Sequence, residues 1–435
     1  MKVVIVGGGI GGMSLALSLC AAGLADIDVY ESAPAVRELG VGINVLPHAV
    51  RELAELGLQD ELSRIGVPTA DYTYYSRHGQ QIWREPLGIA AGYRWPQLSI
   101  HRGELLGVLH RAVLKRLGPG RIHTNHQLSR FGNRDDGGIW AEFIGRDAAG
   151  VAARAEADLL VGCDGIHSTV RNALYPKGDP LRWNGVLMWR GVSQAAPFLS
   201  GRSMVNIGSS KRRTVVYPIS LVPDQRNGSL INWVATCQVS TSGMPPQDWT
   251  NLAERERVVE TFADFTFDFL DVVQLIRDAD VIYQYPMVDK DPLPSWNFGR
   301  TTLLGDAAHP MHPVGGNGAS QAILDARVLA RELASRQTIE SALSAYDSQR
   351  RPATAAIAQS NRKAGPHRCQ DLVEERAPDG FNDILDVMTR QELEGIADDY
   401  KLTTGSEIDR LNNRESLSVP SSVESRPEPD ASSAP

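Results

Sequence analysis

Cysteine is scarce in this sequence, and its four cysteines, Cys20, Cys163, Cys237 and Cys369, lie far apart. They form neither a CxxC pair nor the closely spaced set of a disulfide framework. A disulfide-stabilised secreted domain is therefore disfavoured, and a reducing cytoplasmic location is expected. No metal site is expected either.

The sequence also lacks a strong excess of one charge. It has 44 Lys and Arg against 52 Asp and Glu, a net charge of -8 over 435 residues, and no basic run that would suggest a nucleic-acid partner. A hydrophobic content of 42% with 22% charged residues is typical of a globular chain. This length predicts two interwoven domains with an appendage.

Long apolar segments are missing, with one apparent exception near the start of the chain. Residues 3–25 carry no charge and follow Lys2, a pattern that superficially resembles a secretory signal or a membrane span. Six glycines within this stretch would weaken a continuous apolar helix. We therefore interpret it as folded interior, and no membrane anchor is expected.

The same stretch contains a βαβ pattern. Residues 2–6 are rich in β-branched side chains, residues 10–22 have small and apolar side chains at helical spacing, and residues 27–31 again resemble a strand. The turn after the first strand reads Gly-Gly-Gly-Ile-Gly-Gly over residues 7–12, a GxGxxG motif, and Glu31 ends the second strand. Together these features predict a dinucleotide site.

Each residue of this motif has a mechanical role. Gly7 makes the tight turn, Gly9 lets the backbone approach a pyrophosphate, and Gly12 permits close helix packing, while Glu31 can accept hydrogen bonds from a ribose. The N-terminus of the helix supplies partial positive charge. The motif alone does not choose between FAD and NAD.

Two further motifs lie downstream. Residues 301–304 form a predicted buried strand, followed by Gly-Asp-Ala-Ala-His-Pro at 305–310, a glycine-rich loop and a helix over about 319–335. Asp306 can bind a polyol chain, and the helix N-terminus can stabilise a ring that becomes anionic on reduction. Asp164-Gly165, between another predicted strand and a helix beginning near Ser168, is the third motif.

The three motifs, in this order, resemble those of the class A flavoprotein aromatic hydroxylases, the family of para-hydroxybenzoate and salicylate hydroxylases. The resemblance covers roughly residues 1–365. Within the family it is closest to the branch that acts on phenazine carboxylates, through residues 40–44, 99–105, 188–192, 285–289 and 317–322. The segment from about 365 to 413 extends beyond that branch, so its substrate or oligomer contacts are expected to differ.

The resemblance implies an α/β fold: a Rossmann-like FAD-binding domain of the GR2 type, an interleaved antiparallel substrate sheet and C-terminal helices. The alternating pattern around His78-Gly79 and the strand-like runs between 181 and 285 agree with such a second sheet. The expected limits are 1–71, 98–180 and 285–365 for the FAD-binding domain, 72–97 and 181–284 for the substrate domain, 366–414 for a helical extension, and 415–435 for a disordered tail.

The resemblance also implies a function. The chain would hold FAD, take electrons from NADH or NADPH, and insert one atom of O2 into an aromatic or heteroaromatic acid through a C4a-hydroperoxide of the flavin, with or without loss of CO2. The substrate would be of the phenazine-carboxylate or salicylate type. The protein would act as a monomer or homodimer.

Residues are assigned to three roles, the FAD contacts by the motifs and the resemblance, and Trp189, Arg190, Arg213 and Tyr217 because they fall in predicted strands of the substrate sheet and combine aromatic with cationic side chains. The cofactor-binding residues are Gly7, Gly9, Ile10, Gly11, Gly12, Glu31, Gly42, Arg102, Leu128, Asp164, Asp306, Gly316, Asn317 and Gly318. The substrate-contacting residues are Trp189, Arg190, Pro313, Val314 and Gly315. The catalytic residues are Arg213 and Tyr217.

Alternatives stay open at several points. Arg213 belongs to a Lys-Arg-Arg run that could be solvent-exposed, and Trp189 could be an ordinary core residue. At the level of function, the alternative is an FAD oxidase or dehydrogenase on the same scaffold, which would form only H2O2. A flavin-dependent binding or redox-sensing protein is a third hypothesis.

Overall fold

The computed structural model describes residues 1–36, 40–145, 150–220, 228–239, 243–245 and 251–419. Its first sheet is parallel, with the strand order β20-β12-β1-β2-β8. The strands are β1 (Val3–Val6), β2 (Ile27–Tyr30), β8 (Ile122–His123), β12 (Leu159–Gly162) and β20 (Thr301–Leu303). Except for the half-buried Ile122 of the edge strand β8, their β-branched and leucine side chains are buried because helices cover the sheet. The βαβ prediction at the start of the chain is confirmed.

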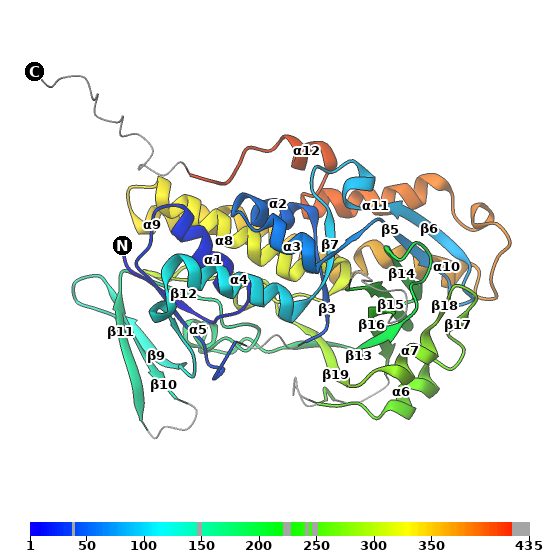
Figure 1. The fold of residues 1–435 in the computed structure, drawn as a ribbon, viewed down its shortest axis with the longest axis horizontal. Helices are drawn as coiled ribbons and strands as arrows, with labels where there is room; N and C mark the ends of the chain where they lie inside the picture. Colours follow the sequence, from blue (N-terminus) through cyan, green and yellow to red (C-terminus); the bar gives the residue numbers. More distant parts are fainter. Residues whose placement is uncertain (37–39, 146–149, 221–227, 240–242, 246–250, 420–435) are drawn as a thin grey trace, which may run out of the picture.

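Two helices from distant parts of the sequence pack together on this sheet. Helix α1 (Ile10–Ala21) is buried from Gly12 to Leu19 and lies against α8 (Asn317–Ser335), as Figure 1 shows at the left. The neighbouring helices are α2 (Pro47–Glu55), α3 (Gln59–Ile65), α4 (Arg102–Leu117), α5 (Thr169–Leu174) and α9 (Ile339–Arg362). Segments near residues 10, 165 and 317 are thereby brought to one edge of the sheet.

The second large sheet has seven strands in the order β19-β13-β16-β15-β14-β5-β6. Their bounds are β5 (Asp71–Tyr75), β6 (Gln81–Pro86), β13 (Arg182–Ala195), β14 (Ser203–Gly208), β15 (Arg212–Pro218), β16 (Ser229–Gln238) and β19 (Ile282–Asp289). The predicted interleaving is confirmed, because β5 and β6 are inserted between elements of the first domain. The pairing of β14 with β5 is parallel, which the sequence analysis did not predict.

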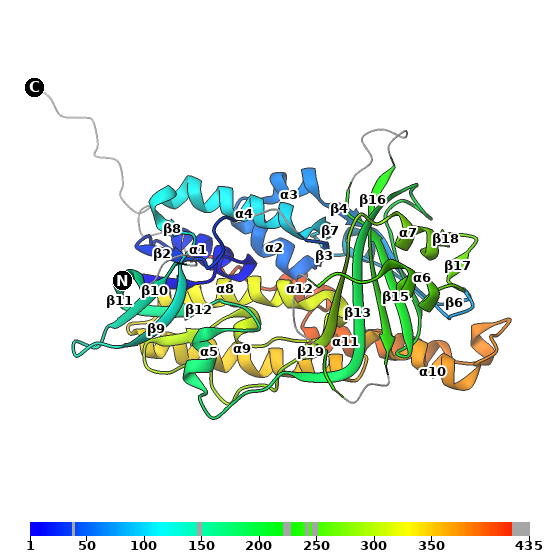
Figure 2. The ribbon, with the colours of Figure 1, turned by 90° about the horizontal axis from the view of Figure 1, so that it is seen from below.

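This sheet has two different faces. One packs against α6 (Arg255–Thr261), α7 (Val272–Asp278) and the short strands β17 (Thr266–Phe267) and β18 (Leu270–Asp271); Figure 2 shows these elements to the right of the sheet. Side chains alternate along β13, so Met188 and Arg190 face a cavity while Trp189 faces α6. Trp189 stacks edge-on against Phe262 and donates to Gln284 at 2.9 Å. The expected substrate contact of Trp189 is therefore wrong, and the core alternative holds.

Two smaller sheets complete the first domain. One is β3 (Gly42–Val45), β7 (Gln97–His101) and β4 (Val67–Thr69), which pair antiparallel in the order β3-β7-β4. The other is β9 (Gln127–Asn133), β10 (Ile139–Ile144) and β11 (Val151–Ala157), and it lies at the end of the molecule away from the seven-stranded sheet. This second sheet was not predicted from the sequence.

The chain after residue 365 forms α10 (Arg368–Arg376), α11 (Arg390–Thr404) and α12 (Ile408–Asn413). We call residues 366–419 the C-terminal extension. Figure 1 shows α10 and α11 beside β5 and β6, on the face of the seven-stranded sheet away from α6 and α7. None of the helices in the described part of the chain is both long and apolar enough to cross a membrane.

The predicted disordered tail begins at residue 415, but its first residues are in contact with α2. Leu417 is buried, and the hydroxyls of Ser416 and Ser418 donate to Glu55. For residues 415–419 the expectation of disorder is thus not met. The remainder of the predicted tail, 420–435, lies outside the described residues.

Candidate active site

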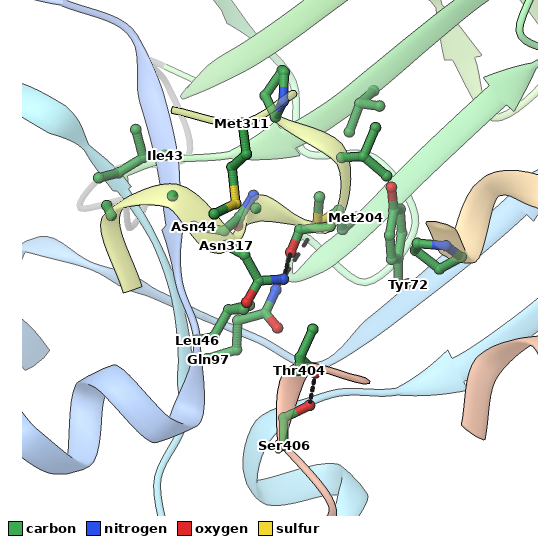
Figure 3. A pocket seen from close by; sticks show the side chains of 18 of the residues that line it. Ile43, Asn44, Leu46, Tyr72, Gln97, Met204, Met311, Asn317, Thr404 and Ser406 are labelled. Carbon is green, nitrogen blue, oxygen red and sulfur yellow. Dashed lines mark hydrogen bonds between the residues drawn. The ribbon is translucent and has the colours of Figure 1, made fainter. Parts of the chain in front are cut away.

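A cavity of about 560 Å³ lies where the two large sheets and the C-terminal extension meet. The loops that follow β1, β12 and β20 reach it at the carboxyl edge of the parallel sheet, which is where ligands bind in open α/β folds. Figure 3 shows side chains from four regions around it, among them Ile43, Gln97, Asn317 and Thr404. This cavity is the candidate active site.

The first glycine loop is shaped by close contacts at two positions and by open space at a third. Gly7 has φ +106°, and a Cβ there would overlap the carbonyl group of Cys163. A Cβ at Gly12 would overlap the carbonyl oxygen of Gly7. At Gly9, by contrast, a Cβ would meet nothing within 4 Å, because the backbone faces the cavity. These surroundings match the separate roles predicted for the three glycines.

Two helix N-termini point at the cavity without a side-chain cap. Helix α1 begins after Gly9 and α8 begins after Gly316, and neither N-cap residue accepts a capping hydrogen bond. Gly315 and Gly316 have φ +68° and +67°, so the loop before α8 needs residues that tolerate left-handed backbone. Uncapped N–H groups with their helix dipoles form sites for negative charge.

The carboxylates of Glu31 and Asp164 accept hydrogen bonds from neighbouring parts of the chain. Glu31 accepts from the N–H of Gly8 at 2.7 Å and of Ala33 at 2.8 Å, which fixes the glycine loop beside the end of β2. Asp164 accepts from Thr169 N–H at 2.7 Å and from Ser168, at the start of α5. Because the Asp164 carboxylate is turned to α5, the cavity is lined instead by its neighbours Cys163 and Gly165.

Asp306 faces the cavity. Its side chain is exposed to that space, and among the described residues it has no hydrogen-bond partner. Although the side chain is open to the cavity, its position inside the protein removes it from bulk water and raises the pKa of its carboxyl. His309 and Arg102 oppose this shift, and Arg102 also lines the cavity. An acceptor left without a partner in such a place matches a ligand that brings hydroxyl groups.

These features fit FAD. Gly9 and the α1 N-terminus would receive the pyrophosphate, Glu31 lies beside the loop where a ribose would bind, and Asp306 would accept from the ribityl hydroxyls. The α8 N-terminus would face the flavin ring. Residues of the first, second and third motifs all line this one cavity.

The opposite wall comes from the seven-stranded sheet. Met188 and Arg190 of β13, Arg213 of β15, and Val234 and Thr236 of β16 line it, all on the face turned away from α6 and α7. This wall combines apolar side chains with two cations, of which Arg213 is buried and Arg190 half-buried.

The side chain of Arg213 is 9% exposed, so the alternative that it faces solvent is excluded. Its Nη1 hydrogen-bonds His367 Nδ1 at 3.1 Å, and its Nη2 lies 3.6 Å from Asp371 Oδ1, too far for a hydrogen bond. Among the described residues its Nε and Nη2 have no hydrogen-bond partner. Burial lowers the pKa of Arg213, and the nearby Asp371 opposes this shift.

Arg190 and Tyr217 share one acceptor, while the Nε of Arg190 has no hydrogen-bond partner among the described residues. Arg190 Nη2 donates to the Gly42 carbonyl at 2.7 Å, and the Tyr217 hydroxyl donates to the same oxygen at 2.9 Å. The Gly42 N–H in turn donates to Asn232. Burial raises the pKa of Tyr217 to about 12, so its hydroxyl is a neutral donor at pH 7. These contacts join β3 to the substrate sheet.

The C-terminal extension forms a third wall, which the sequence analysis missed. The Tyr400 hydroxyl accepts from Asn317 Nδ2 at 3.0 Å and lies 3.1 Å from the Val314 carbonyl. A Cβ at Gly315 would overlap the Tyr400 ring. Figure 3 shows Thr404 and Ser406, whose hydroxyl oxygens are 2.7 Å apart, beside the same pocket. The only sequence signal was the length of chain beyond the family resemblance.

The structure brings most of the predicted residues together. Those that line the cavity are Gly9, Ile10, Gly11, Arg102, Arg190, Arg213, Tyr217, Asp306, Pro313, Val314, Gly315, Gly316, Asn317 and Gly318. Those that do not are Gly7, Gly12, Glu31, Gly42, Leu128, Asp164 and Trp189. Most of the second group shape a neighbouring loop or strand. Leu128 belongs to β9 and the first core, with no place at the cavity.

Comparison with known proteins gives a consistent result. Residues 1–361 match the family model of the FAD binding domain. The chain is 43% identical over 362 residues to phenazine 1,6-dicarboxylic acid hydroxylase of Lysobacter antibioticus, covering 83% of this chain and 89% of that protein. It is 30% identical over 392 residues to salicylate hydroxylase of Pseudomonas putida, covering 84% and 85%.

The fold is shared with solved structures. The crystal structure of HpxO from Klebsiella pneumoniae in complex with FAD and uric acid superposes with a TM-score of 0.74 at 24% identity, covering 93% of this chain and 97% of that one. A salicylate hydroxylase substrate complex gives a TM-score of 0.70 at 22% identity, covering 94% and 98%.

Proposed function

Because this chain belongs to the FAD-dependent monooxygenases that hydroxylate aromatic rings, we propose that its substrate is an aromatic or heteroaromatic carboxylic acid. The electron donor is NADH or NADPH, and O2 is the co-substrate. A phenazine-carboxylate type of ring is favoured over a salicylate type by the 43% identity to the phenazine dicarboxylic acid hydroxylase. CO2 is lost where the oxygen enters at the carboxyl-bearing carbon.

The observation that carries this proposal is the state of Arg213. A guanidinium that is 9% exposed and lines the cavity has two nitrogens, Nε and Nη2, without hydrogen bonds among the described residues. Leaving such donors unpaired costs free energy, on the order of 1–3 kcal/mol each, which a ligand carboxylate would recover. The surrounding Met188, Val215 and Val234 offer apolar contact to a ring.

FAD, when bound, supplies the activation of O2. The protein contributes further functions. The apolar side chains of the seven-stranded sheet exclude water from the reacting ring, and Arg213 holds the acid in one orientation. The α8 N-terminus at Gly316 stabilises negative charge that develops on the cofactor side of the cavity. Tyr217 and Arg190 keep the wall in place through Gly42.

Acid and amide pairs with the same ring test the proposal. Phenazine-1-carboxylate would be compared with its carboxamide, and salicylate with salicylamide, by following NADH and NADPH oxidation and the gain of one oxygen by mass spectrometry. We expect the acids to be oxygenated and the amides to be poor substrates. Arg213→Met should weaken acid binding by about 10- to 100-fold and leave amide binding nearly unchanged.

Two results would contradict this assignment. Coenzyme oxidation that yields only H2O2 with every ring acid favours the oxidase alternative. Equal binding of acid and amide by the unmodified protein removes the role given to Arg213.

A further inference from the structure

The C-terminal extension carries two side chains that flank the cation of the substrate pocket. His367 and Asp371 are four residues apart, at the start of α10, and this spacing places them on one face of the helix. One contacts Nη1 of Arg213 and the other lies near Nη2. Both belong to the part of the chain beyond residue 361, where the match to the family model ends.

We propose that His367 and Asp371 are positioning residues through which the C-terminal extension sets how tightly, and in which orientation, Arg213 binds the substrate carboxylate. This inference rests on the proposed function, since it assumes that Arg213 receives the acid.

The contact of His367 leaves one edge of the guanidinium, Nε and Nη2, buried and without a hydrogen-bond partner among the described residues. Nη1 donates to His367 Nδ1 at 3.1 Å, so that ring nitrogen is an acceptor and the ring proton belongs to Nε2, which lies 3.5 Å from the Tyr72 hydroxyl oxygen. With Nη1 engaged, Nε and Nη2 remain as two parallel donors on the same side of Arg213. That edge matches the two oxygens of a carboxylate, in the bidentate geometry that arginine favours.

Asp371 acts on the charge of Arg213. Burial lowers the pKa of His367 well below its usual value and raises the pKa of Cys369 to about 12, so both are neutral at pH 7. Burial likewise raises the pKa of Tyr72 and of Tyr74. Among these neighbours only Asp371, whose Oδ1 is 3.6 Å from Nη2, opposes the positive charge.

The two residues therefore have opposite effects on an incoming acid. His367 orients the guanidinium without changing its charge, so its loss weakens binding. Asp371 competes with the substrate carboxylate for Nη2, so removing its charge strengthens binding. The Asp371 side chain is 28% exposed, and solvent screening keeps this second effect small.

Two substitutions separate these effects from simple damage to the fold. Asp371→Asn removes the charge and keeps an oxygen that can accept from the Ser210 N–H, a bond of 2.6 Å. His367→Leu removes the acceptor, whereas His367→Asn can return an acceptor oxygen close to the position of Nδ1. Asp379→Asn, an exposed acid of the same extension, controls for the change in net charge.

The measurement is equilibrium binding of phenazine-1-carboxylate and its carboxamide to the FAD-loaded protein without NADH or NADPH, by isothermal titration calorimetry. We expect Asp371→Asn to bind the acid about two- to fivefold more tightly. His367→Leu should bind it about tenfold more weakly, and His367→Asn should lie close to the unmodified protein. Amide binding should change little in any variant, and Asp379→Asn should change neither ligand.

The outcomes separate a failure of the proposed function from a failure of the inference about the C-terminal extension. If the unmodified protein does not prefer acid to amide, the proposed function is wrong. If it does, but Asp371→Asn leaves the ratio of acid to amide affinity unchanged or lowers it, the inference about the extension is wrong. Should His367→Leu fail to hold FAD or to fold, the tightening expected for Asp371→Asn still decides.

Discussion

Individual glycines of the first loop differ in what a methyl group would meet there. Gly12 is packed against the Gly7 carbonyl, while Gly9, with φ -77°, faces open space in a conformation that alanine adopts without strain. We expect Gly12→Ala to destabilise the protein by about 1–3 kcal/mol through overpacking. Gly9→Ala should leave the stability of the apoprotein unchanged and weaken FAD binding at least about tenfold, or ~1.4 kcal/mol.

Urea unfolding of the apoprotein and titration of FAD fluorescence measure these two quantities separately. A Gly9→Ala variant that binds FAD normally would show that the pyrophosphate does not approach this part of the loop.

His48 of α2 is a buried residue with an unusual environment. It is 2% exposed, and neither ring nitrogen has a hydrogen-bond partner among the described residues. Burial, together with Arg350 and Arg414, lowers the pKa of His48 to about 3 from the ordinary 6.5. The unfolded chain therefore binds a proton below pH 6.5 that the folded protein does not bind until about pH 3.

Stability should consequently fall as the pH is lowered through this window, by up to about 1.4 kcal/mol per pH unit from His48 alone. His48→Leu removes this contribution. As the pH drops from 7 to 5, the free energy of unfolding should therefore fall less in the variant than in the unmodified protein. Urea unfolding at several pH values measures the difference. Parallel curves for the two proteins would contradict the prediction, and surface His78→Asn serves as the control.

At the level of whole elements, neighbouring residues of one strand have opposite surroundings. Met188 faces the cavity and Trp189 faces α6, because side chains of a strand alternate. Met188→Phe should therefore raise the KM for the aromatic acid at least about tenfold and change stability by less than about 1 kcal/mol. Trp189→Phe should leave KM unchanged and cost about 1–3 kcal/mol, since it loses volume and the bond to Gln284.

Steady-state kinetics and urea unfolding of the two variants check both expectations. If the Trp189 variant changes KM and the Met188 variant does not, the assigned register of β13 is wrong.

The same strand illustrates what the sequence could predict at this scale. The strand-like runs between 181 and 285 indicated a second sheet, and the glycine motifs indicated where the parallel sheet would bind a dinucleotide. The pattern could not tell which face of β13 meets the cavity, since both Met188 and Trp189 are large and apolar. The parallel contact of β14 with β5 was also hidden, because residues 203 and 71 are paired only by the folded sheet.

At the scale of the whole molecule, the loop of the cavity before α8 is contacted by a residue far along the chain, Tyr400. Tyr400 of α11 bonds Asn317 and contacts the Val314 carbonyl, and its ring occupies the space left by Gly315. Local sequence patterns cannot predict such contacts between residues about 85 positions apart. They depend on how the extension docks, and the sequence predicted no more than a helical extension over 366–414.

Tyr400→Phe should accordingly destabilise the protein by about 1–3 kcal/mol and also weaken FAD binding, because the loop before α8 loses its hydrogen bonds. Tyr93→Phe is the matched control. Its hydroxyl holds the same extension through the Ser406 carbonyl, without contact to that loop. Thermal unfolding and FAD titration should show a stability loss in both variants and weakened FAD binding in Tyr400→Phe alone. Equal FAD affinities would indicate that the loop holds its shape unaided.

The interleaved order of the segments around the cavity has a consequence for protein synthesis. Strand β1 leaves the ribosome about 300 residues before β20, and α11 follows later still. A nascent chain that ends before residue 390 already contains all three glycine motifs, yet it lacks one side of the chamber in which they operate. The wall that contains Tyr400 can therefore complete the cavity only after residue 400 has been synthesised.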